Sequence, residues 1–177
     1  MRLAPTLPCV LFGLAACAKP ESPAQTTTRM AAEAATARTA IEATNARWMA
    51  HLAAGHADSV AALYATNARM MPEGAPTAVG HAAIAQAYGQ MFAMGQWTIQ
   101  LHPDSVWANG PLVLETGTWT STFKPAAGAP PMDTASTGKY MVRWTQENGR
   151  WVLADDIFNS DKMPSPPPAA PASRRKD

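Results

Sequence analysis

The sequence predicts an α+β fold in which helices come first and an antiparallel β-meander follows. Residues 30–54 are rich in alanine and hold no glycine or proline, a composition that favours helix. After Gly95, apolar and polar residues alternate, which is the period of a strand that buries one face. Asn148-Gly149 then marks a tight hairpin turn. The helices are therefore expected to cover one face of a curved sheet.

The first helix is predicted over residues 30–54. Ile41, Asn45, Trp48 and Leu52 recur there at the spacing of one helical face, so they are expected to face the core. Gly55 is expected to end the helix, because glycine readily adopts the left-handed conformation found just past helix ends.

Two further helices are predicted before the meander. A short helix is expected over residues 58–65, followed by an apolar strand over 68–71 that ends at Pro72. Gly80 then precedes a third helix, whose inward face includes Tyr88.

Four strands are predicted in the second half of the chain. They are expected over residues 97–102, 112–124, 138–146 and 150–158. The first two strands are joined by a turn at 109–111, because Asn-Gly-Pro is a turn sequence. No internal repeat is evident, so the chain is expected to hold one domain.

The N-terminus has the features of a lipoprotein signal. Arg2 precedes an apolar run of about ten residues, too short to span a bilayer as a mature helix. The run ends in Leu-Ala-Ala-Cys at 14–17, which resembles the bacterial lipobox, where the thiol becomes the lipidated N-terminus. The sequence therefore predicts a signal peptide over 1–16 and lipidation of Cys17, the alternative being an ordinary secreted protein. After cleavage, Ala18 would be the second residue of the mature chain. In lipoproteins of bacteria with two membranes an aspartate at that position implies retention at the inner membrane, so the resemblance implies an outer-membrane anchor that faces the periplasm.

Two segments outside the predicted domain lack apolar periodicity. Residues 17–29 are rich in Pro, Ser, Thr and Gln and are expected to form a flexible tether. Residues 163–177 hold five prolines and three basic residues, so an extended, disordered basic tail is expected. The folded domain is thus predicted over 30–162.

Composition and motifs exclude several classes of protein. Residues 30–162 carry 8 Lys+Arg against 11 Asp+Glu, and an acidic domain argues against nucleic-acid binding. The chain holds only two cysteines, which excludes a disulfide-dense scaffold and a multi-cysteine zinc module. Its four histidines lie in different elements, and no GxSxG, P-loop or GxGxxG pattern is present. We therefore expect no metal and no cofactor.

The order of short motifs along residues 38–162 resembles the SnoaL-like and DUF4440 branch of the NTF2-like superfamily. The motifs that carry the resemblance are GHAD at 55–58, LYA at 63–65, MPEG at 71–74, GKY at 138–140 and DIFNSD at 156–161. The resemblance implies a cystatin-like cone, with three N-terminal helices packed on a strongly curved, mainly antiparallel sheet. It also implies an apolar pocket at the wide end of the cone, to which the last strand contributes, and it makes a homodimer a possible assembly.

This superfamily includes ketosteroid isomerase, and two positions argue against that activity here. The resemblance places the isomerase base just before Pro72, where this chain has Met71, and a thioether takes no proton near neutral pH. The position of the oxyanion-donating tyrosine corresponds to Trp48, whose indole is far less acidic.

Two carboxylates are candidate catalytic groups. Glu115 shares a strand face with Val113 and Trp119, so it lies either on an apolar concave face, with a raised pKa, or outward in an ion pair. Asp156 lies near the end of the last strand, which the resemblance places beside the cavity. Asp156 acting with Asn159 is the preferred site, and the alternative is a role in tying down the end of the strand.

The candidate ligand-binding residues are mainly large aromatic side chains, for which a place in the core is the alternative. These candidates are Trp48, Tyr64, Met71, Glu73, Trp97, Trp119, Tyr140 and Asn159.

Three functions remain open at this stage. The preferred hypothesis is a membrane-anchored domain that binds a small apolar or amphipathic molecule. The second is an isomerase, cyclase or dehydratase that uses Glu115 or Asp156 as its base. The third is a non-catalytic assembly module that dimerises through an exposed sheet face.

Overall fold

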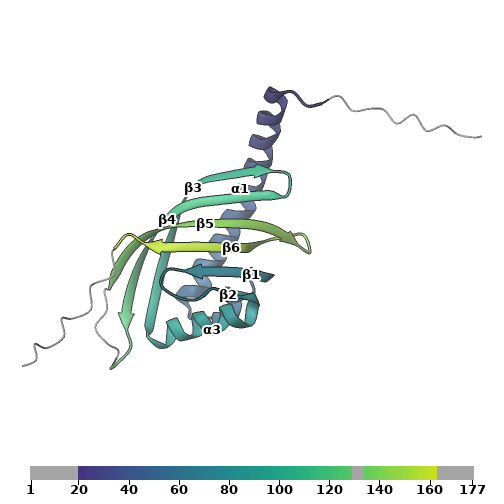
Figure 1. The fold of residues 1–177 in the computed structure, drawn as a ribbon. Helices are drawn as coiled ribbons and strands as arrows, with labels where there is room; N and C mark the ends of the chain where they lie inside the picture. Colours follow the sequence, from purple (N-terminus) through teal and green to yellow (C-terminus); the bar gives the residue numbers. More distant parts are fainter. Residues whose placement is uncertain (1–19, 129–133, 163–177) are drawn as a thin grey trace, which may run out of the picture.

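The computed structural model describes residues 20–128 and 134–162 and has the α+β architecture that the sequence predicts (Figure 1). The helices are α1 (Pro23–Ala53), α2 (Ala57–Ala61) and α3 (Gly80–Ala93). The strands are β1 (Tyr64–Pro72), β2 (Ala78–Val79), β3 (Gly95–Asn109), β4 (Leu112–Pro125), β5 (Ala135–Glu147) and β6 (Arg150–Ser160).

All six strands form one curved sheet in the order β2-β1-β6-β5-β4-β3. Strands β3 to β6 form the predicted antiparallel meander, and β1 pairs with β6 in parallel. The Asn148-Gly149 turn joins β5 to β6, and both of its residues have the positive φ that this tight turn requires.

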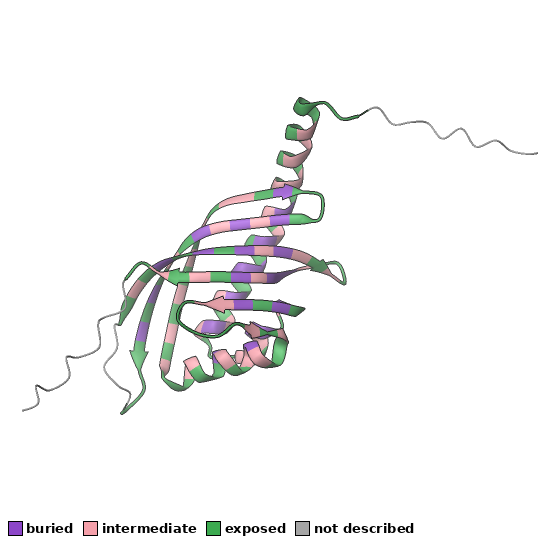
Figure 2. Ribbon diagram, viewed as in Figure 1, coloured by how far each residue is buried: buried purple, intermediate pink, exposed green. Residues whose placement is uncertain are grey.

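The core lies between the inner face of this sheet and the helices. Helix α1 packs against β3, and α3 packs against α2 and β1. The predicted helical face of α1 is buried, with Ile41 and Leu52 almost inaccessible to solvent. Figure 2 shows buried residues along one side of α1 and at alternate positions of the strands, the two periods expected for helix and sheet.

Helix α1 begins seven residues before the predicted boundary at residue 30. Ser22 caps it in a reciprocal capping box with Gln25, and Pro23 occupies the first turn. Residues 23–29 are therefore helical, which corrects the prediction that the flexible tether extends to residue 29. The added turns are held by the β3–β4 turn, where Arg29 bonds Asn109 and the Gly110 N–H donates to Glu33.

Two other boundaries differ from the prediction. Tyr64 begins β1 instead of continuing a second helix, because it pairs with β6, where the Leu153 N–H donates to the Leu63 carbonyl. Strand β3 continues to Asn109 although Pro103 lacks an N–H. Because β3 is an edge strand, it accommodates the proline as an irregularity between Pro103 and Ser105.

Other sequence predictions lie outside the described residues. These are the signal peptide at 1–16, the lipidation of Cys17 and the tail at 163–177. In the part of the chain that the structure describes, no helix is both long and apolar enough to cross a membrane.

Candidate functional site

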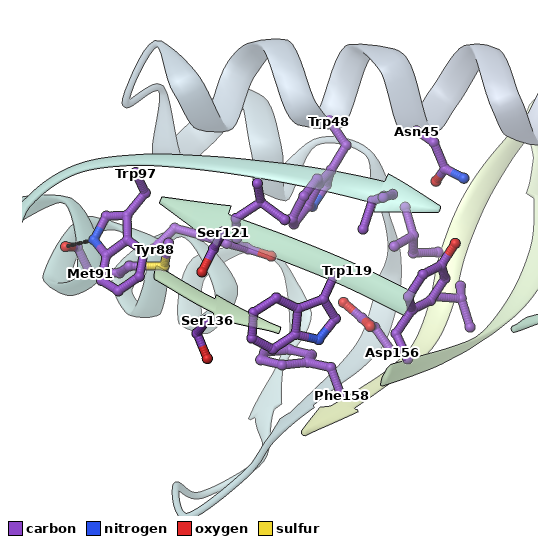
Figure 3. A pocket seen from close by; sticks show the side chains of 15 residues that line it. Asn45, Trp48, Tyr88, Met91, Trp97, Trp119, Ser121, Ser136, Asp156 and Phe158 are labelled. Carbon is purple, nitrogen blue, oxygen red and sulfur yellow. Dashed lines mark hydrogen bonds between the residues drawn. The ribbon is translucent and has the colours of Figure 1, made fainter. Parts of the chain in front are cut away.

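A cavity of about 310 Å³ lies between the inner face of the sheet and helices α1 and α3 (Figure 3). Most of its wall is apolar and aromatic. The aromatic lining residues are Trp48, Tyr88, Trp97, Trp119, Tyr140 and Phe158. A few polar side chains interrupt this wall, namely Asn45, Ser121, Ser136 and Asp156. An apolar cavity with a few polar groups is the usual form of a small-molecule site.

Asp156 is the carboxylate that reaches this cavity. It lies on β6 with only 6% of its surface exposed, and its Oδ2 accepts a hydrogen bond from the Tyr64 hydroxyl at 2.7 Å. Burial raises the pKa of Asp156 to about 6, since the Tyr64 bond opposes the shift only in part and the negative charge of Glu115 adds to it. Asp156 can therefore gain or lose a proton near neutral pH.

A chain of hydroxyls extends from Asp156 across the core. Tyr64 lies behind the cavity wall, and its hydroxyl is 2.9 Å from that of Tyr88, which lines the cavity. Burial and the nearby charge of Asp156 raise the pKa of both phenols, so both remain protonated. The chain links a cavity-lining phenol to the carboxylate through one buried hydroxyl.

Glu115 lies inside the fold but behind the cavity wall. None of its surface is exposed, and burial raises its pKa even though three neutral groups donate to it. Its Oε1 accepts from Asn45 Nδ2 and the Tyr140 hydroxyl, and its Oε2 accepts from Trp144 Nε1, each at 2.8 Å. Asn45 and Tyr140 line the cavity and stand in front of it. Glu115 therefore fixes the orientation of two lining side chains and does not itself face a ligand.

Two glycines make room for aromatic residues of the cavity wall. Gly138 is paired with Trp119, and a Cβ at position 138 would collide with the indole ring. Gly117 is paired with Tyr140, and a Cβ there would lie 2.7 Å from the Tyr140 hydroxyl. In each case the ring lies across the partner strand, which fixes its position on the inner face of the sheet.

Two indole nitrogens at the cavity have no hydrogen-bond acceptor among the described residues. They belong to Trp48 on α1 and Trp119 on β4, and both nitrogens are buried. Trp48 lies edge-on to Tyr88, with ring centroids 6.2 Å apart. Its N–H lies close enough to the Tyr88 hydroxyl to lower the pKa of that phenol, although the two groups do not reach the geometry of a full hydrogen bond. The neighbouring Trp97 indole, in contrast, donates to the Met91 carbonyl at 3.0 Å.

The structure brings half of the predicted ligand-binding residues to the cavity. Trp48, Trp97, Trp119 and Tyr140 line it, and Tyr64 contributes through its bond to Asp156. The sequence left the faces of Asp156 and Glu115 open, and the structure places both carboxylates on the inner side of the sheet.

Three further predicted ligand-binding residues neither line the cavity nor bond to a residue that does. Met71 is half-buried and pairs with Ile157, an exposed residue of the outer face. Glu73 accepts the Ser160 N–H at 2.7 Å, so it fastens the end of β6. Asn159 is exposed on the face opposite Asp156 and donates to the Ser160 carbonyl. The pairing of Asp156 with Asn159 was wrong, because residues three apart in a strand point to opposite faces.

Sequence reasoning missed several lining residues. Asn45 and Tyr88 had been recognised only as helix-face positions, and Ser121 and Ser136 carried no signal. Phe158 shares the face of Asp156 by simple alternation, so the sequence could have indicated it. The serines could not be found, because only the pairing of β4 with β5 brings them to the wall.

The described residues contain no group of three or more His, Cys, Asp or Glu side chains placed to hold a metal ion. The side chains that line the cavity offer hydrogen bonding, proton exchange at Asp156 and apolar contact.

Comparison with known families decides the classification. Residues 45–154 match the model of the SnoaL-like domain. The chain belongs to the SnoaL-like family. The match to the family model ends at residue 154, before Asp156 and Phe158. The assignment of these two residues to the cavity wall therefore comes from the structure and not from the family model. No curated protein sequence matches the chain significantly.

Solved structures similar to this SnoaL-like domain share its fold at low sequence identity. A ketosteroid isomerase-like protein from Erwinia carotovora atroseptica is 19% identical, with a TM-score of 0.60 over 71% of this chain and 96% of its own. A protein of unknown function with a cystatin-like fold from Nostoc punctiforme is 16% identical, with a TM-score of 0.60 over 73% and 93%. A Catenulispora acidiphila protein in complex with S-DNPA is 16% identical, with a TM-score of 0.58 over 72% and 95%. These similarities confirm the predicted cystatin-like, NTF2-like fold.

Proposed function

We propose that this SnoaL-like domain binds a small apolar or amphipathic molecule in the cavity between α1, α3 and the sheet. The observation that supports this most strongly is the cavity itself, which is about 310 Å³ and walled by six aromatic side chains. Cavities from about 300 Å³ upward hold small organic ligands in other proteins. The Catenulispora acidiphila protein of the same fold has been solved in complex with S-DNPA, which is consistent with a ligand here.

The test is thermal unfolding of the purified protein against bicyclic aromatic, steroid-like and fatty acyl compounds. A ligand at one hundred times its Kd should stabilise the folded state by about 2.7 kcal/mol, a shift of several degrees in Tm. Ile99→Trp, which fills the cavity, should abolish the shift. Ile157→Trp makes the same change on the outer face and should leave it intact. The proposal fails if no compound shifts Tm, or if both variants respond like the original chain.

A second candidate function is acid–base catalysis by Asp156. Its support is that Asp156 lines the cavity with a pKa of about 6, close to the pH at which a general base works best. Glu115 lies behind Asn45 and Tyr140, so it would act as a positioning residue. Asp156→Asn should then abolish turnover of a bound substrate while its affinity stays within about threefold. Unchanged turnover in this variant would eliminate the enzyme hypothesis.

We also propose that the domain is held at the cell envelope by a lipid on Cys17. The support lies in the sequence, where Leu-Ala-Ala-Cys at 14–17 follows a short apolar run. The full chain expressed in a bacterium with two membranes should incorporate labelled palmitate and fractionate with the outer membrane. Cys17→Ser should lose both properties. Soluble, unlabelled protein from the original chain would contradict the anchor.

Self-association through the outer face of the sheet is a further proposal. Met141 and Ile157 pair across β5 and β6, are 45% and 50% exposed, and lie in a shallow hollow with Thr116 and Thr118. An exposed apolar patch often marks a contact with another protein chain. This patch is separate from the ligand cavity, so the two proposals can be tested independently.

A further inference from the structure

The two indole nitrogens without an acceptor distinguish this cavity from a purely apolar one. Trp48 and Trp119 both line it, and neither N–H has a protein acceptor in the described part of the chain. Buried polar groups in folded proteins are nearly always paired, because a donor that loses water and gains no acceptor destabilises the fold. A phenylalanine at either position would avoid this cost, so the two donors require an explanation.

Apart from Ser121, the other polar side chains of the wall already have partners. Tyr140 and Asn45 donate to Glu115, Tyr88 bonds Tyr64, and Ser136 bonds Ser160. Trp97 lines the same cavity, and its N–H is taken by the Met91 carbonyl. The hydrogen-bonding groups left for a ligand are therefore the two indole donors, the Ser121 hydroxyl and the free oxygen of Asp156.

Both indoles are held in place before any ligand arrives. The Trp119 ring occupies the space that Gly138 leaves open, and Trp48 packs edge-on against Tyr88. Figure 3 shows the Trp119 nitrogen on the side of its ring toward Asp156. Donors fixed in advance lose little conformational entropy on binding, so each can contribute most of a hydrogen bond to affinity.

The chemistry of these groups defines the ligand. An indole nitrogen only donates, so its partner must be an acceptor such as a carbonyl or ether oxygen. The carboxylates Asp156 and Glu115 lie at or just behind the wall, and no cation faces them among the side chains known to line the cavity. An anionic ligand would be repelled there, which favours a neutral one.

We propose, on the basis of the small-molecule function above, that Trp48 and Trp119 form an acceptor-recognising pair. The pair selects neutral, mostly apolar molecules that carry an oxygen acceptor. It sets specificity, whereas the remaining aromatic residues supply contact area.

A matched pair of probes tests this pair directly. The compounds are 1-tetralone and tetralin, which share a bicyclic skeleton and differ in the carbonyl oxygen. The proteins are the original chain, Trp48→Phe, Trp119→Phe and, as the control, Trp97→Phe. Calorimetric titration gives the ratio of the two Kd values for each protein.

The original chain should bind the ketone about fivefold more tightly than the hydrocarbon for each hydrogen bond formed, which is about 1 kcal/mol. Trp119→Phe and Trp48→Phe should each reduce this preference, with the larger loss at Trp119 because Trp48 also lies beside the Tyr88 hydroxyl. Trp97→Phe should keep the preference. Without ligand, Trp119→Phe should unfold at the same or a higher urea concentration, because an unsatisfied donor has been removed.

The outcomes separate this inference from the function on which it depends. If both probes bind with equal Kd, or if the ketone preference survives in Trp48→Phe and Trp119→Phe, the acceptor pair is refuted while small-molecule binding stands. If neither probe binds the original chain, small-molecule binding is contradicted for bicyclic compounds, and the acceptor pair is contradicted with it. 1-Naphthoate provides the anionic probe, and binding as tight as that of 1-tetralone would refute the selection for neutral ligands.

Discussion

The pKa of a carboxyl group is shifted in opposite directions on the inner and outer faces of the sheet, as Asp156 and its neighbour Asp155 illustrate. Asp156 points inward, is bonded only to a neutral tyrosine and has a raised pKa. Asp155 points outward between Arg69 and Arg143, at 2.6 and 2.5 Å, and these bonds outweigh its partial burial and lower its pKa. The inner face thus holds a carboxylate that can exchange a proton near neutral pH, and the outer face holds one that stays charged.

A second comparison lies within the inner face. Glu115 is as deeply buried as Asp156, but three donors occupy its two oxygens, and it is covered by Asn45 and Tyr140. Asp156 has one hydroxyl partner and reaches the cavity. Burial alone therefore does not identify a functional carboxylate. Glu115 has three hydrogen-bond donors and no access to the cavity, which indicates a structural role, whereas Asp156 has one donor and reaches the cavity.

The largest effect is expected at Glu115. Glu115→Ala leaves the Asn45 amide, the Tyr140 hydroxyl and the Trp144 indole without their acceptor. We expect a loss of about 3–5 kcal/mol in the free energy of unfolding, measured by urea denaturation. Glu115→Gln keeps an acceptor oxygen and should lose less than half of that. Equal stability of Glu115→Ala and the original chain would contradict the structural role of Glu115.

Asp156 should show a smaller, pH-dependent effect. The folded state holds its proton up to about pH 6, whereas an unfolded aspartate releases it near pH 4. Folding stability therefore falls as the pH rises across that window, by about 3 kcal/mol. Asp156→Asn does not titrate, so its stability relative to the original chain should rise by about that amount between pH 4 and pH 7.

Urea denaturation at several pH values measures this difference. Glu115, whose pKa is also raised, titrates in both proteins, and Tyr64, Tyr88 and Tyr140 remain protonated, so the difference largely isolates Asp156. A pH-independent difference would show that Asp156 is charged throughout, like its neighbour Asp155.

Asp155→Asn should give a smaller effect of opposite sign. The folded pKa of Asp155 is lowered, so its ion pairs stabilise the protein above the unfolded pKa and are lost as the pH falls through the folded value. Because both arginines are about half exposed, the expected loss at pH 7 is about 1 kcal/mol, shrinking below about pH 4. Thermal unfolding at pH 7 and at successively lower pH measures this loss, and a loss that does not shrink as the pH falls would contradict the role of the ion pairs.

The smallest effect on stability is expected from the double substitution of Met141→Ser and Ile157→Ser. Both side chains are about half exposed, so the unfolding free energy of the monomer should change by less than about 0.5 kcal/mol. Sedimentation velocity should show a shift from dimer to monomer if the outer face mediates self-association. A dimer that survives both substitutions would exclude this patch as the interface.

Most of the helices and strands, and their order, could be predicted from local sequence patterns, although the short strand β2 was not. Alanine content and the spacing of Ile41, Trp48 and Leu52 indicated α1, and alternation with the Asn148-Gly149 turn indicated the meander. Those signals are local, because helix and strand periods are set by residues a few positions apart. The start of α1 at Pro23 was missed although Ser22, Pro23 and Gln25 form a local capping signal, and the bond from Arg29 to Asn109 adds a contact that the sequence does not show.

Which of the candidate residues form the site depends on tertiary structure. Alternation placed Asp155 and Asp156 on opposite faces, but only the folded, curved sheet shows which of the two faces the cavity. In the same way, three donors from α1 and β5 enclose Glu115, and the space above Gly138 accommodates Trp119. These relations join residues dozens of positions apart, so they depend on strand register and helix packing, which local sequence patterns do not encode.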